Sequence, residues 1–496
     1  MKNGPNPMDL KQKLFAGGGE EKVEEQHRAG KKTARERMVA LLDAGSFIET
    51  DVYLKAHDTD APAEGVVAGY GTVQGRPVYV YAQDYTVLQG SLSATNAKKI
   101  CKVMDMAVKT GTPVVALLDT AGARIKNGVS ALDGYATVMR KTVQASGVIP
   151  QIAVVMGPCA GAAAVAAELQ DVVIAVDKTA QLSGRGAGVL SAAGSDFDAG
   201  AMSANACGNA SLFAADDEAA LVLVQQLLGY LPDNNLEDAP MDLCADDLNR
   251  ACPELDGYVP GQGDIRTVIA ALCDNGDSLE MAPYFAMNMT TALGRINGRT
   301  VGFVANNPLD KGGVMDVDAC EKAARFVSLC DCFNLPVVTL VDSNGLPVCG
   351  CQEKAGLVRA TAKLAYSYAA ASVAKVTLVT GRAIGSAYVT MASRGLGSDL
   401  VYAWPQAEIA PLEADAAAIM VYDQEIEASE DPIAARNDYA EQYRTVDASP
   451  VAAASKGLVD DILAPSESRP VLASALELLQ GKREEPVGKK HGVMPM

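Results

Sequence analysis

Histidine is scarce in this chain. Its 496 residues include only three, His27, His57 and His491, and all lie in terminal or polar segments. A Ser-His-Asp or Cys-His catalytic unit needs a histidine within hydrogen-bond reach of its nucleophile. The sequence therefore argues against catalysis of that kind.

Long apolar runs are also missing. No stretch stays apolar over the roughly 20 residues that a membrane-spanning helix needs. The N-terminal sequence MKNGPNPMDLKQKL has neither the apolar core of a signal peptide nor the composition of a transit peptide. We therefore expect a cytoplasmic protein in a reducing compartment.

Positive charge is in deficit. The chain has 42 Lys and Arg against 61 Asp and Glu, which gives a net charge of −19. This balance argues against nucleic acid or an anionic membrane as a general partner. An anionic ligand would have to be held by local donors, meaning backbone N–H groups and a few Arg or Lys.

The eleven cysteines show no regular framework. Two close pairs, Cys330/Cys332 and Cys349/Cys351, invite comparison with metal sites. The first pair lies in a helical pattern, where residues two apart point to different faces, which is poor geometry for chelation. We expect ordinary reduced thiols in both pairs and no metal in this chain.

The two halves of the chain repeat each other. At an offset of 223 residues, as from Asp119 to Asp342, GTVQGRPVYVYAQD pairs with GRINGRTVGFVANN and GTPVVALLDT pairs with NLPVVTLVDS. A period this long exceeds any solenoid unit, so it indicates two copies of a whole domain. The length also suits two domains.

We predict domains at 1–245 and 246–496, with the acidic stretch 231–262, rich in Pro and Asp, as the linker. Strand patterns at about 66–82 and in PVVALLD flank the helical pattern KKICKVMDMAVKTG, and the second copy repeats this from 294 to 342. Strands that alternate with helices predict α/β domains, each a twisted sheet backed by helices.

Each copy leads from an apolar strand into a turn of small residues. IPQIAVVMGP runs into 159–163, and VAKVTLVTG runs into 382–387. Small residues let a ligand approach the backbone, and free N–H groups at a helix start favour negative charge. Two such turns suit a reaction with two developing oxyanions, although tight helix–strand packing requires the same residues.

Ordered motifs along nearly the whole chain identify a family. They are GKKTARERMVALLDAGSFIETD, QDYTVLQGSLS, AGARIKNGVSALDGYA, ASGVIPQIAVVMGPCAGAA, MDVDACEKAARFVSLCDCFNLPVVTLVD, ASVAKVTLVTGRAIGSAY and YAWPQAEIA. The chain resembles the carboxyltransferase (β) subunits of biotin-dependent acyl-CoA carboxylases of the propionyl-/methylmalonyl-CoA type. It is equally similar to the α subunits of the carboxyacyl-CoA decarboxylases that are linked to sodium pumps.

The resemblance implies two duplicated crotonase-like domains of the ClpP/crotonase superfamily, the first for acyl-CoA and the second for biotin. The implied reaction moves a carboxyl group between carrier-bound biotin and the α-carbon of a short acyl-CoA. Backbone oxyanion holes would hold the enolate. No side-chain base is needed, which agrees with the scarcity of histidine.

The resemblance also assigns site residues. The Gly161 and Ala162 amides would stabilise the thioester enolate, and the Ser386 and Ala387 amides, next to Gly385, would hold the ureido oxygen. Residues expected to contact CoA or to line the acyl pocket are Gly90, Ser91, Thr120, Ala121, Gly122, Ala123, Arg124 and Val389. For Arg124, phosphate binding, loop ordering and an ordinary surface or interdomain ion pair are all open.

Three departures from the family pattern affect these loops. Where the family usually has a second glycine, the first turn has Ala162 and the second has Ser386. Each replacement keeps the backbone N–H, but its Cβ atom narrows the space through which a ligand approaches that N–H. The segment 179–208 carries QLSGRGAGVLSA and SANACGNAS in place of the usual ITGP and Thr-His motifs. Asn344-Gly345-Leu346 replaces Pro-Gly-Phe. Altered specificity or weakened activity in the 179–208 and 343–351 loops is therefore an open alternative.

Partners follow from what the chain lacks. It has no Ala-Met-Lys-Met biotinylation motif and no ATP-binding glycine loop, so biotin is expected on a separate carrier protein. By resemblance, the other partners are a biotin carboxylase or a membrane decarboxylase pump subunit, which would bring the chain to a membrane. A homo-oligomer, either dimer or hexamer, is also implied.

Two other functions compete with this one. A non-catalytic scaffold paralogue would fit the altered 179–208 loop. A crotonase-type hydratase or isomerase would need a positioned acid or base. The nearby carboxylates are Glu64, Asp84 and Glu168, which look more like solvated or capping residues.

Overall fold

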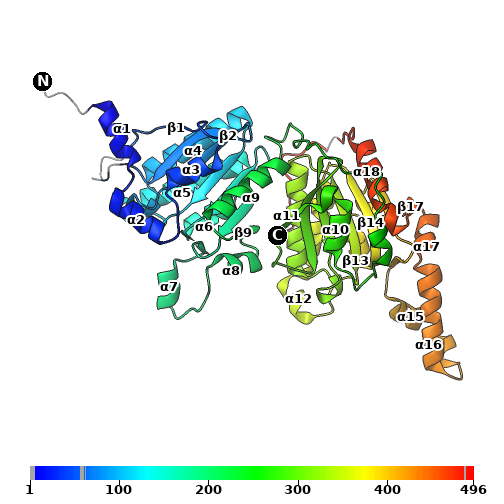
Figure 1. The fold of residues 1–496 in the computed structure, drawn as a ribbon. Coiled ribbons are helices and arrows are strands. Elements are labelled where there is room, and N and C mark those ends of the chain that lie inside the picture. The colour runs from blue at the N-terminus through cyan, green and yellow to red at the C-terminus, as the bar shows by residue number, and fades with distance from the viewer. Residues whose placement is uncertain (1–5, 56–60, 62, 485–486, 496) are drawn as a thin grey trace. The chain divides into compact units, whose positions relative to one another are not determined.

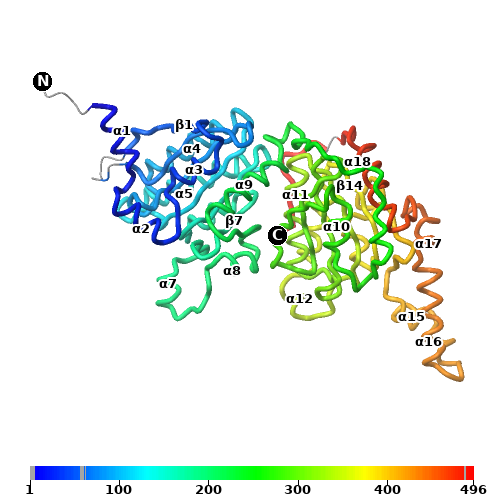
Figure 2. Tube along the Cα trace, viewed as in Figure 1, coloured from blue at the N-terminus to red at the C-terminus, as the bar shows by residue number. Residues whose placement is uncertain are grey.

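The computed structural model describes residues 6–55, 61, 63–484 and 487–495, so His57 lies outside the described residues. The chain divides into two compact units, Met1–Asp238 and Ala239–Met496 (Figures 1 and 2). This boundary falls inside the stretch 231–262, where the only regular element is a 3₁₀ turn at Pro253–Gly257. Within the described ranges, no helix is long and apolar enough to cross a membrane.

The first unit is built around a seven-stranded sheet in the order β1-β2-β3-β4-β5-β7-β9. Strands β2 and β3 form an antiparallel hairpin, and the strands from β3 to β9 run parallel. A separate short pair joins β6 to β8. The strands are β1 (Ile48–Glu49), β2 (Val66–Val73), β3 (Arg76–Gln83), β4 (Val114–Leu118), β5 (Gln151–Val155), β6 (Pro158–Ala160), β7 (Val172–Val176), β8 (Gln181–Ser183) and β9 (Leu212–Ala214).

Helices cover this sheet because each packs an apolar face against the apolar side chains of the strands. Helices α4 and α5 pack buried residues such as Ile100 and Val138 into one core with the strands. Helices α3 and α9 contact each other and further strands. The helices are α1 (Pro7–Phe15), α2 (Glu20–Arg28), α3 (Ala34–Leu41), α4 (Ala94–Thr110), α5 (Val129–Ala145), α6 (Ala162–Glu168), α7 (Ala187–Ala192), α8 (Ala201–Ala206) and α9 (Asp217–Tyr230).

The second unit repeats this plan with the strand order β10-β11-β12-β13-β14-β15-β17, and β16 also pairs with β14. Strands β10, β11 and β12 are antiparallel, and the rest run parallel. The strands are β10 (Ser278–Met281), β11 (Met289–Ile296), β12 (Arg299–Asn306), β13 (Val337–Ser343), β14 (Lys375–Ile384), β15 (Leu400–Ala403), β16 (Glu408–Ala410) and β17 (Asp461–Ile462).

In the second unit, residues of α10 and α18 share a core with the strands and with Trp404. Helices α11 and α13 pack together, as do α15 and α16, which extend away from the sheet (Figure 1). The helices are α10 (Ile265–Leu272), α11 (Val317–Cys332), α12 (Gly350–Ala355), α13 (Leu357–Ala370), α14 (Ser386–Thr390), α15 (Ala414–Glu427), α16 (Pro432–Gln442), α17 (Pro450–Ser455) and α18 (Ser468–Leu479).

The duplication holds at the level of strand register. Ala82 pairs with Leu117 between β3 and β4, and Ala305 pairs with Leu340 between β12 and β13. Both partners of the second pair lie 223 residues after those of the first. The repeat in the sequence is therefore a repeat of structure.

Each unit also buries a lysine at the equivalent place. Nζ of Lys99 donates to the Val66 carbonyl at 2.8 Å, and Nζ of Lys322 donates to the Ala282 and Phe285 carbonyls, both at 2.8 Å. Burial lowers the pKa of both lysines, that of Lys322 to about 7. The charged form is thus disfavoured in the folded state.

Replacing Lys322 with Met should change how the stability of the second unit depends on pH. The folded pKa of about 7 lies below the ordinary value of 10.5. Between these values the unfolded chain binds more protons, so the free energy of unfolding should rise with pH, by up to about 1.4 kcal/mol per pH unit. Urea unfolding followed by the fluorescence of Trp404, the only tryptophan, should show this rise between pH 7 and 8, below the range in which the unfolded thiols of the buried cysteines titrate.

The Lys322→Met variant should lose that rise, whereas Lys456→Met, which replaces an exposed lysine of the same unit, should keep it. An equal slope in the parent chain and in Lys322→Met would contradict the assigned pKa.

Candidate functional site

The two turns of small residues adopt the same backbone conformation. In the first, β6 leads through Gly161 into α6, and in the second β14 leads through Gly385 into α14. The φ and ψ angles are 63° and −127° at Gly161 and 56° and −124° at Gly385. A side chain would strain this positive-φ conformation, so each turn requires glycine.

The N–H group of each of these glycines is already bonded. Gly161 donates to the Ser183 carbonyl at 3.0 Å, and Gly385 donates to the Ala410 carbonyl at 2.9 Å. The Gly161 amide, which was expected to stabilise the enolate, is therefore not free in this structure. Its N–H instead ties the turn to the end of β8, as that of Gly385 ties the second turn to β16.

The next two N–H groups of each turn are the ones without a hydrogen bond. In the described part of the chain, the N–H groups of Ala162, Ala163, Ser386 and Ala387 form no hydrogen bond. These residues are the first two of helices α6 and α14, where no preceding helical carbonyl exists to accept their N–H groups. Each turn therefore has a pair of adjacent unbonded donors, of which Ala162 and Ser386 are at least partly exposed and Ala163 and Ala387 are buried.

A buried aspartate supports each turn from behind. A Cβ on Gly157 would lie 2.0 Å from Oδ1 of Asp119, and one on Gly381 would lie 2.3 Å from Oδ1 of Asp342. Both carboxylates are almost fully buried. The chain can pass this close only as glycine, which fixes the strand end that leads to each turn.

The two aspartates are compensated differently. Asp119 accepts hydrogen bonds from Nζ of Lys31 at 3.0 Å, Nη1 of Arg37 at 3.0 Å and Nε2 of Gln26 at 2.8 Å. Asp342 instead accepts from backbone N–H groups, those of residues 261 at 2.8 Å and 382 at 3.0 Å. Burial raises the pKa of Asp342, and these backbone bonds oppose the rise only in part.

The loops expected to contact CoA come together in the first unit. The Thr120 hydroxyl donates to the Gly90 carbonyl at 2.8 Å and accepts from the Gly122 N–H at 3.0 Å. Ala121 donates its N–H to the Gln89 carbonyl at 2.9 Å. Residues 90–91 and 120–124 thus form one bonded ledge, and Ala123 lies on it in a bridge to Leu92.

Arg124 orders this ledge from within. Its Nη2 donates to Oε2 of Glu64 at 2.9 Å and to the Ser91 carbonyl at 3.2 Å, and both charged side chains are buried. The ion pair is therefore buried inside the first unit. Of the alternatives left open for Arg124, loop ordering fits this arrangement, and a surface or interdomain pair does not.

Two of the three carboxylates considered for acid–base catalysis are buried, although solvated or capping residues were expected. Glu64 is paired with Arg124. Asp84 is buried and accepts from the Thr86 N–H at 3.1 Å and hydroxyl at 2.6 Å. Burial raises the pKa of Asp84. Glu168 ends α6 and is partly exposed.

Cys159 precedes the first turn but is not a candidate nucleophile. Its side chain is fully buried, and burial raises the pKa of the thiol to about 12. A thiol with such a pKa stays protonated at neutral pH. Val389 lies on α14, and its side chain is half-exposed.

The altered segment 179–208 builds part of the first turn. It contains β8, α7 and α8, and its Ser183 supplies the carbonyl that binds the Gly161 N–H. Neither Ser183 nor Ala410 could be picked out from the sequence. Both act through a backbone carbonyl, which leaves no requirement for a particular side chain.

The cysteine pairs differ from each other. Cys330 and Cys332 form no disulfide, as expected. Cys349 and Cys351 are joined by a disulfide, so the expectation of reduced thiols is wrong for that pair. Within the described ranges, no group of three or more His, Cys, Asp or Glu is placed to hold a metal ion.

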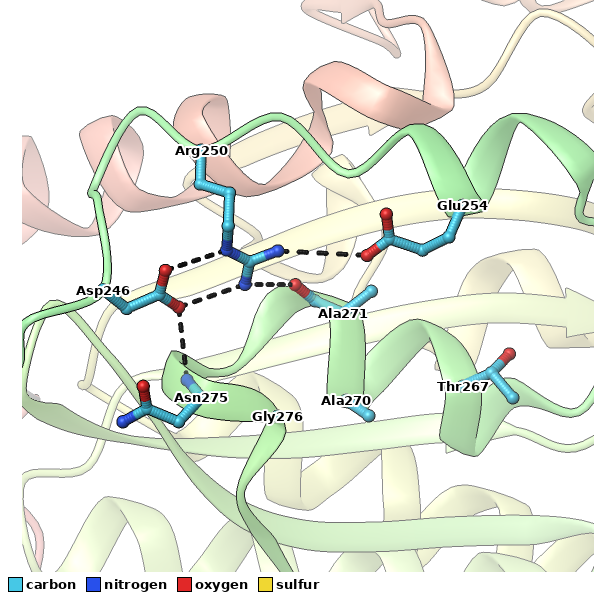
Figure 3. Close-up of a pocket in the computed structure, with 8 residues that line it drawn as sticks. All are labelled: Asp246, Arg250, Glu254, Thr267, Ala270, Ala271, Asn275 and Gly276. Carbon is cyan, nitrogen blue, oxygen red and sulfur yellow. Dashed lines mark hydrogen bonds and ion pairs between the residues drawn. The ribbon is translucent and has the colours of Figure 1, made fainter.

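A surface pocket of about 520 Å³ lies in the second unit, away from these turns in the sequence (Figure 3). Its polar groups bind one another: Arg250 donates to Asp246 at 2.9 Å and to the Ala271 carbonyl at 3.1 Å. Its lining residues are Asp246, Arg250, Glu254, Thr267, Ala270, Ala271, Asn275 and Gly276. None of these residues belongs to the predicted site. Because Arg250 is already bonded to groups of the pocket wall, we assign the pocket no role in ligand binding.

Comparison with known proteins gives a consistent result. The carboxyl transferase domain model matches residues 25–494. The chain is 42% identical to the methylmalonyl-CoA decarboxylase subunit alpha of Propionigenium modestum, over 98% of this chain and 97% of the relative. It is 44% identical to the propionyl-CoA carboxylase beta chain of Saccharopolyspora erythraea, over 97% of this chain and 93% of the relative.

Among solved structures, the transcarboxylase 12S hexamer with methylmalonyl-coenzyme A and methylmalonic acid bound is 41% identical. It matches with a TM-score of 0.96 and full coverage of both chains. Such agreement extends the likeness from sequence to the fold, a pair of crotonase-like domains. Because the family model and these relatives span almost all of its length, this chain belongs to the carboxyl transferase family.

Proposed function

We propose that this chain is the carboxyltransferase component of a biotin-dependent acyl-CoA carboxylase or decarboxylase. The observation that carries the proposal is the pair of equivalent turns, each with two unbonded N–H groups behind a glycine of positive φ. The reaction has two oxygen atoms that need stabilisation, one on the thioester and one on the biotin ureido group. Two donor pairs meet that need.

The first turn is suited to the thioester. When the carboxyl group leaves the α-carbon, the electrons of the broken C–C bond move to the thioester oxygen as an enolate. The N–H groups of Ala162 and Ala163 would donate to that oxygen, with Gly161 holding the turn. The ledge formed by residues 90–91 and 120–124 would support the CoA moiety, with Arg124 as an internal brace.

The second turn is suited to biotin. The N–H groups of Ser386 and Ala387 would donate to the ureido oxygen, and Gly385 leaves the approach open. When bound, biotin supplies the ureido nitrogen that carries the carboxyl group and takes up the α-proton. The residues 1–245 and 246–496 are accordingly proposed as the acyl-CoA and the biotin domain.

The protein need not supply a catalytic histidine. His27 is bonded to Oε2 of Glu36 at 2.9 Å, where α2 meets the start of α3, and His491 is exposed near the C-terminus. The carboxylates Glu64 and Asp84 are committed to Arg124 and to Thr86. This supports transfer chemistry over a hydratase or isomerase, which requires a positioned acid or base.

We further propose a propionyl-/methylmalonyl-CoA-like substrate, because proteins with those names are its relatives. The proposed partners are a biotin carboxyl carrier protein and either a biotin carboxylase or a membrane decarboxylase pump subunit. A homo-oligomer in the cytoplasm, recruited to the membrane where the partner is a pump, completes the proposal. The scaffold alternative gains no support, since the altered segment still supplies the Ser183 carbonyl that ties the first turn.

The activity is tested by incubating the full chain with malonyl-, methylmalonyl- and glutaconyl-CoA, with and without free biotin. Mass spectrometry would follow the loss of the carboxyl group. We expect biotin-dependent decarboxylation of methylmalonyl-CoA, because both donor pairs are preformed. No turnover of any thioester, together with no binding of CoA, would contradict the proposal and favour the scaffold.

Replacing Ala162 with Pro tests the first donor pair directly. Ala162 is the first helical residue of α6, where proline is tolerated because its φ suits the helix start. The change removes one N–H of the proposed oxyanion hole, and kcat should fall by about 10²–10³.

The matched control is Glu20→Pro, which also places a proline after a glycine at the first position of a helix, α2. It should retain the parent kcat. Far-UV circular dichroism would verify that both variants are folded. An Ala162→Pro enzyme that is folded and as active as the control would contradict the assigned role of this amide.

A further inference from the structure

One covalent feature is not explained by carboxyl transfer. Cys349 and Cys351 are joined by a disulfide, and the other nine cysteines form none. Five of those nine are buried. The bridge instead lies at the surface: Cys351 is exposed, Cys349 is partly buried, and Val348 beside them is fully exposed. An external thiol can therefore reach the bridge.

The bridge contributes little to the stability of the fold. It spans a single residue, Gly350, at the start of α12. Closing so short a loop removes little conformational entropy from the unfolded chain, in contrast to a bridge over a long loop. Exposed disulfides are also the ones that reductants open most readily. Its position therefore suits reversible chemistry better than stabilisation.

We propose that Cys349 and Cys351 form a redox-active site that exchanges with an external dithiol. A thiolate of the dithiol attacks one sulfur, forms a mixed disulfide and releases the other cysteine as a thiolate. The second thiol of the dithiol then displaces the remaining cysteine. The external dithiol is oxidised to its disulfide, two electrons and two protons pass to the chain, and Cys349 and Cys351 become thiols.

The same segment is bonded to the surroundings of the second turn. Oε1 of Gln352, in α12, accepts the Val317 N–H at 3.0 Å, and the Gly345 carbonyl accepts the Met315 N–H at 3.0 Å. The Thr390 hydroxyl of α14 donates to the Ser386 carbonyl at 2.8 Å, and its oxygen lies 3.9 Å from the Met315 sulfur. The bridge segment is thus hydrogen-bonded to residues 315 and 317, and Met315 lies against Thr390 of the helix that carries Ser386 and Ala387.

Opening the bridge should loosen this link. The disulfide restricts the backbone of 349–351, and its loss returns to Gly350 the conformational freedom that glycine has in an open chain. The first turn of α12 would fray, and the bond from Gln352 to Val317 would weaken. The redox state of the pair would thus set how firmly the segment 344–352 is held beside the second turn.

The exchange is tested on the full chain in buffers of graded reduced and oxidised glutathione, in which two glutathione molecules take the place of the dithiol. After acid quenching, thiols are labelled in denaturant with light iodoacetamide, and bridged cysteines are labelled with heavy reagent after reduction. Peptide mass spectrometry should show the 349/351 peptide change from heavy to light label in one two-thiol step as reduced glutathione increases.

A pair that stays in the thiol form at every ratio would overturn the proposal. So would a pair that 10 mM dithiothreitol cannot reduce in the folded chain. The variant Cys349→Ser/Cys351→Ser should lose the step. Cys207→Ser, which removes an exposed free thiol, should leave it unchanged. None of these readouts depends on enzymatic activity, so they stand apart from the proposed function.

The link to the second turn is tested by hydrogen exchange of the two redox forms. Amides of Met315 and Val317 should exchange at least severalfold faster in the reduced chain, and those at 120–124 in the first unit should not change. The Cys349→Ser/Cys351→Ser chain should match the reduced form under all conditions. Equal exchange at 315–317 in both forms would overturn the proposed link.

Discussion

The hydrogen bond from the N–H of a positive-φ glycine to a neighbouring strand carbonyl is the constraint on which both candidate sites depend. At Gly161 the acceptor is Ser183, and at Gly385 it is Ala410. The bond uses the glycine amide and sets the direction of the chain as it enters the helix. The next two amides then have no internal acceptor and are left to a ligand. Catalysis by backbone donors requires that such groups be fixed before the substrate arrives, and this bond fixes them.

Behind each turn the same glycine–aspartate contact is stabilised in two ways. In the first unit, Lys31 and Arg37 neutralise Asp119, so the N-terminal helices become part of the foundation of the turn. Arg37 also binds Asp217 at the start of α9. Removing one partner of such a buried cluster leaves an uncompensated charge, which typically costs about 3–5 kcal/mol. In the second unit, Asp342 relies on backbone N–H groups, and the pKa of its carboxyl is raised by burial.

Much of the fold could be predicted from the sequence because the same pattern of strands and helices occurs in both halves of the chain. The hairpin, helix and strand of the first copy recur in the second, and the strand register follows, as the Ala82–Leu117 and Ala305–Leu340 pairs show. The positions of the turns were also predictable, since an apolar strand that runs into glycine and small residues is typical of a tight strand-to-helix turn. The loops at 90–91 and 120–124, which the resemblance assigned to CoA binding, lie together.

Other features could not be predicted from the sequence. The occupied amide of Gly161 depends on a backbone carbonyl at Ser183, which any residue could supply. The pairing of Arg124 with Glu64 joins residues far apart in the chain, and a charged residue in a loop carries no sign of being buried. The bridge between Cys349 and Cys351 could not be told from two reduced thiols, because spacing alone does not fix the oxidation state.

The central claim is that the amides of Ala162 and Ala163 hold the thioester oxygen. It is tested most directly by a crystal structure of the full chain with propionyl-CoA, which has no carboxyl group to lose. The account predicts the thioester oxygen at about 2.7–3.1 Å from both nitrogens. Density that places the thioester at Ser386 and Ala387, or out of reach of either amide pair, would contradict it.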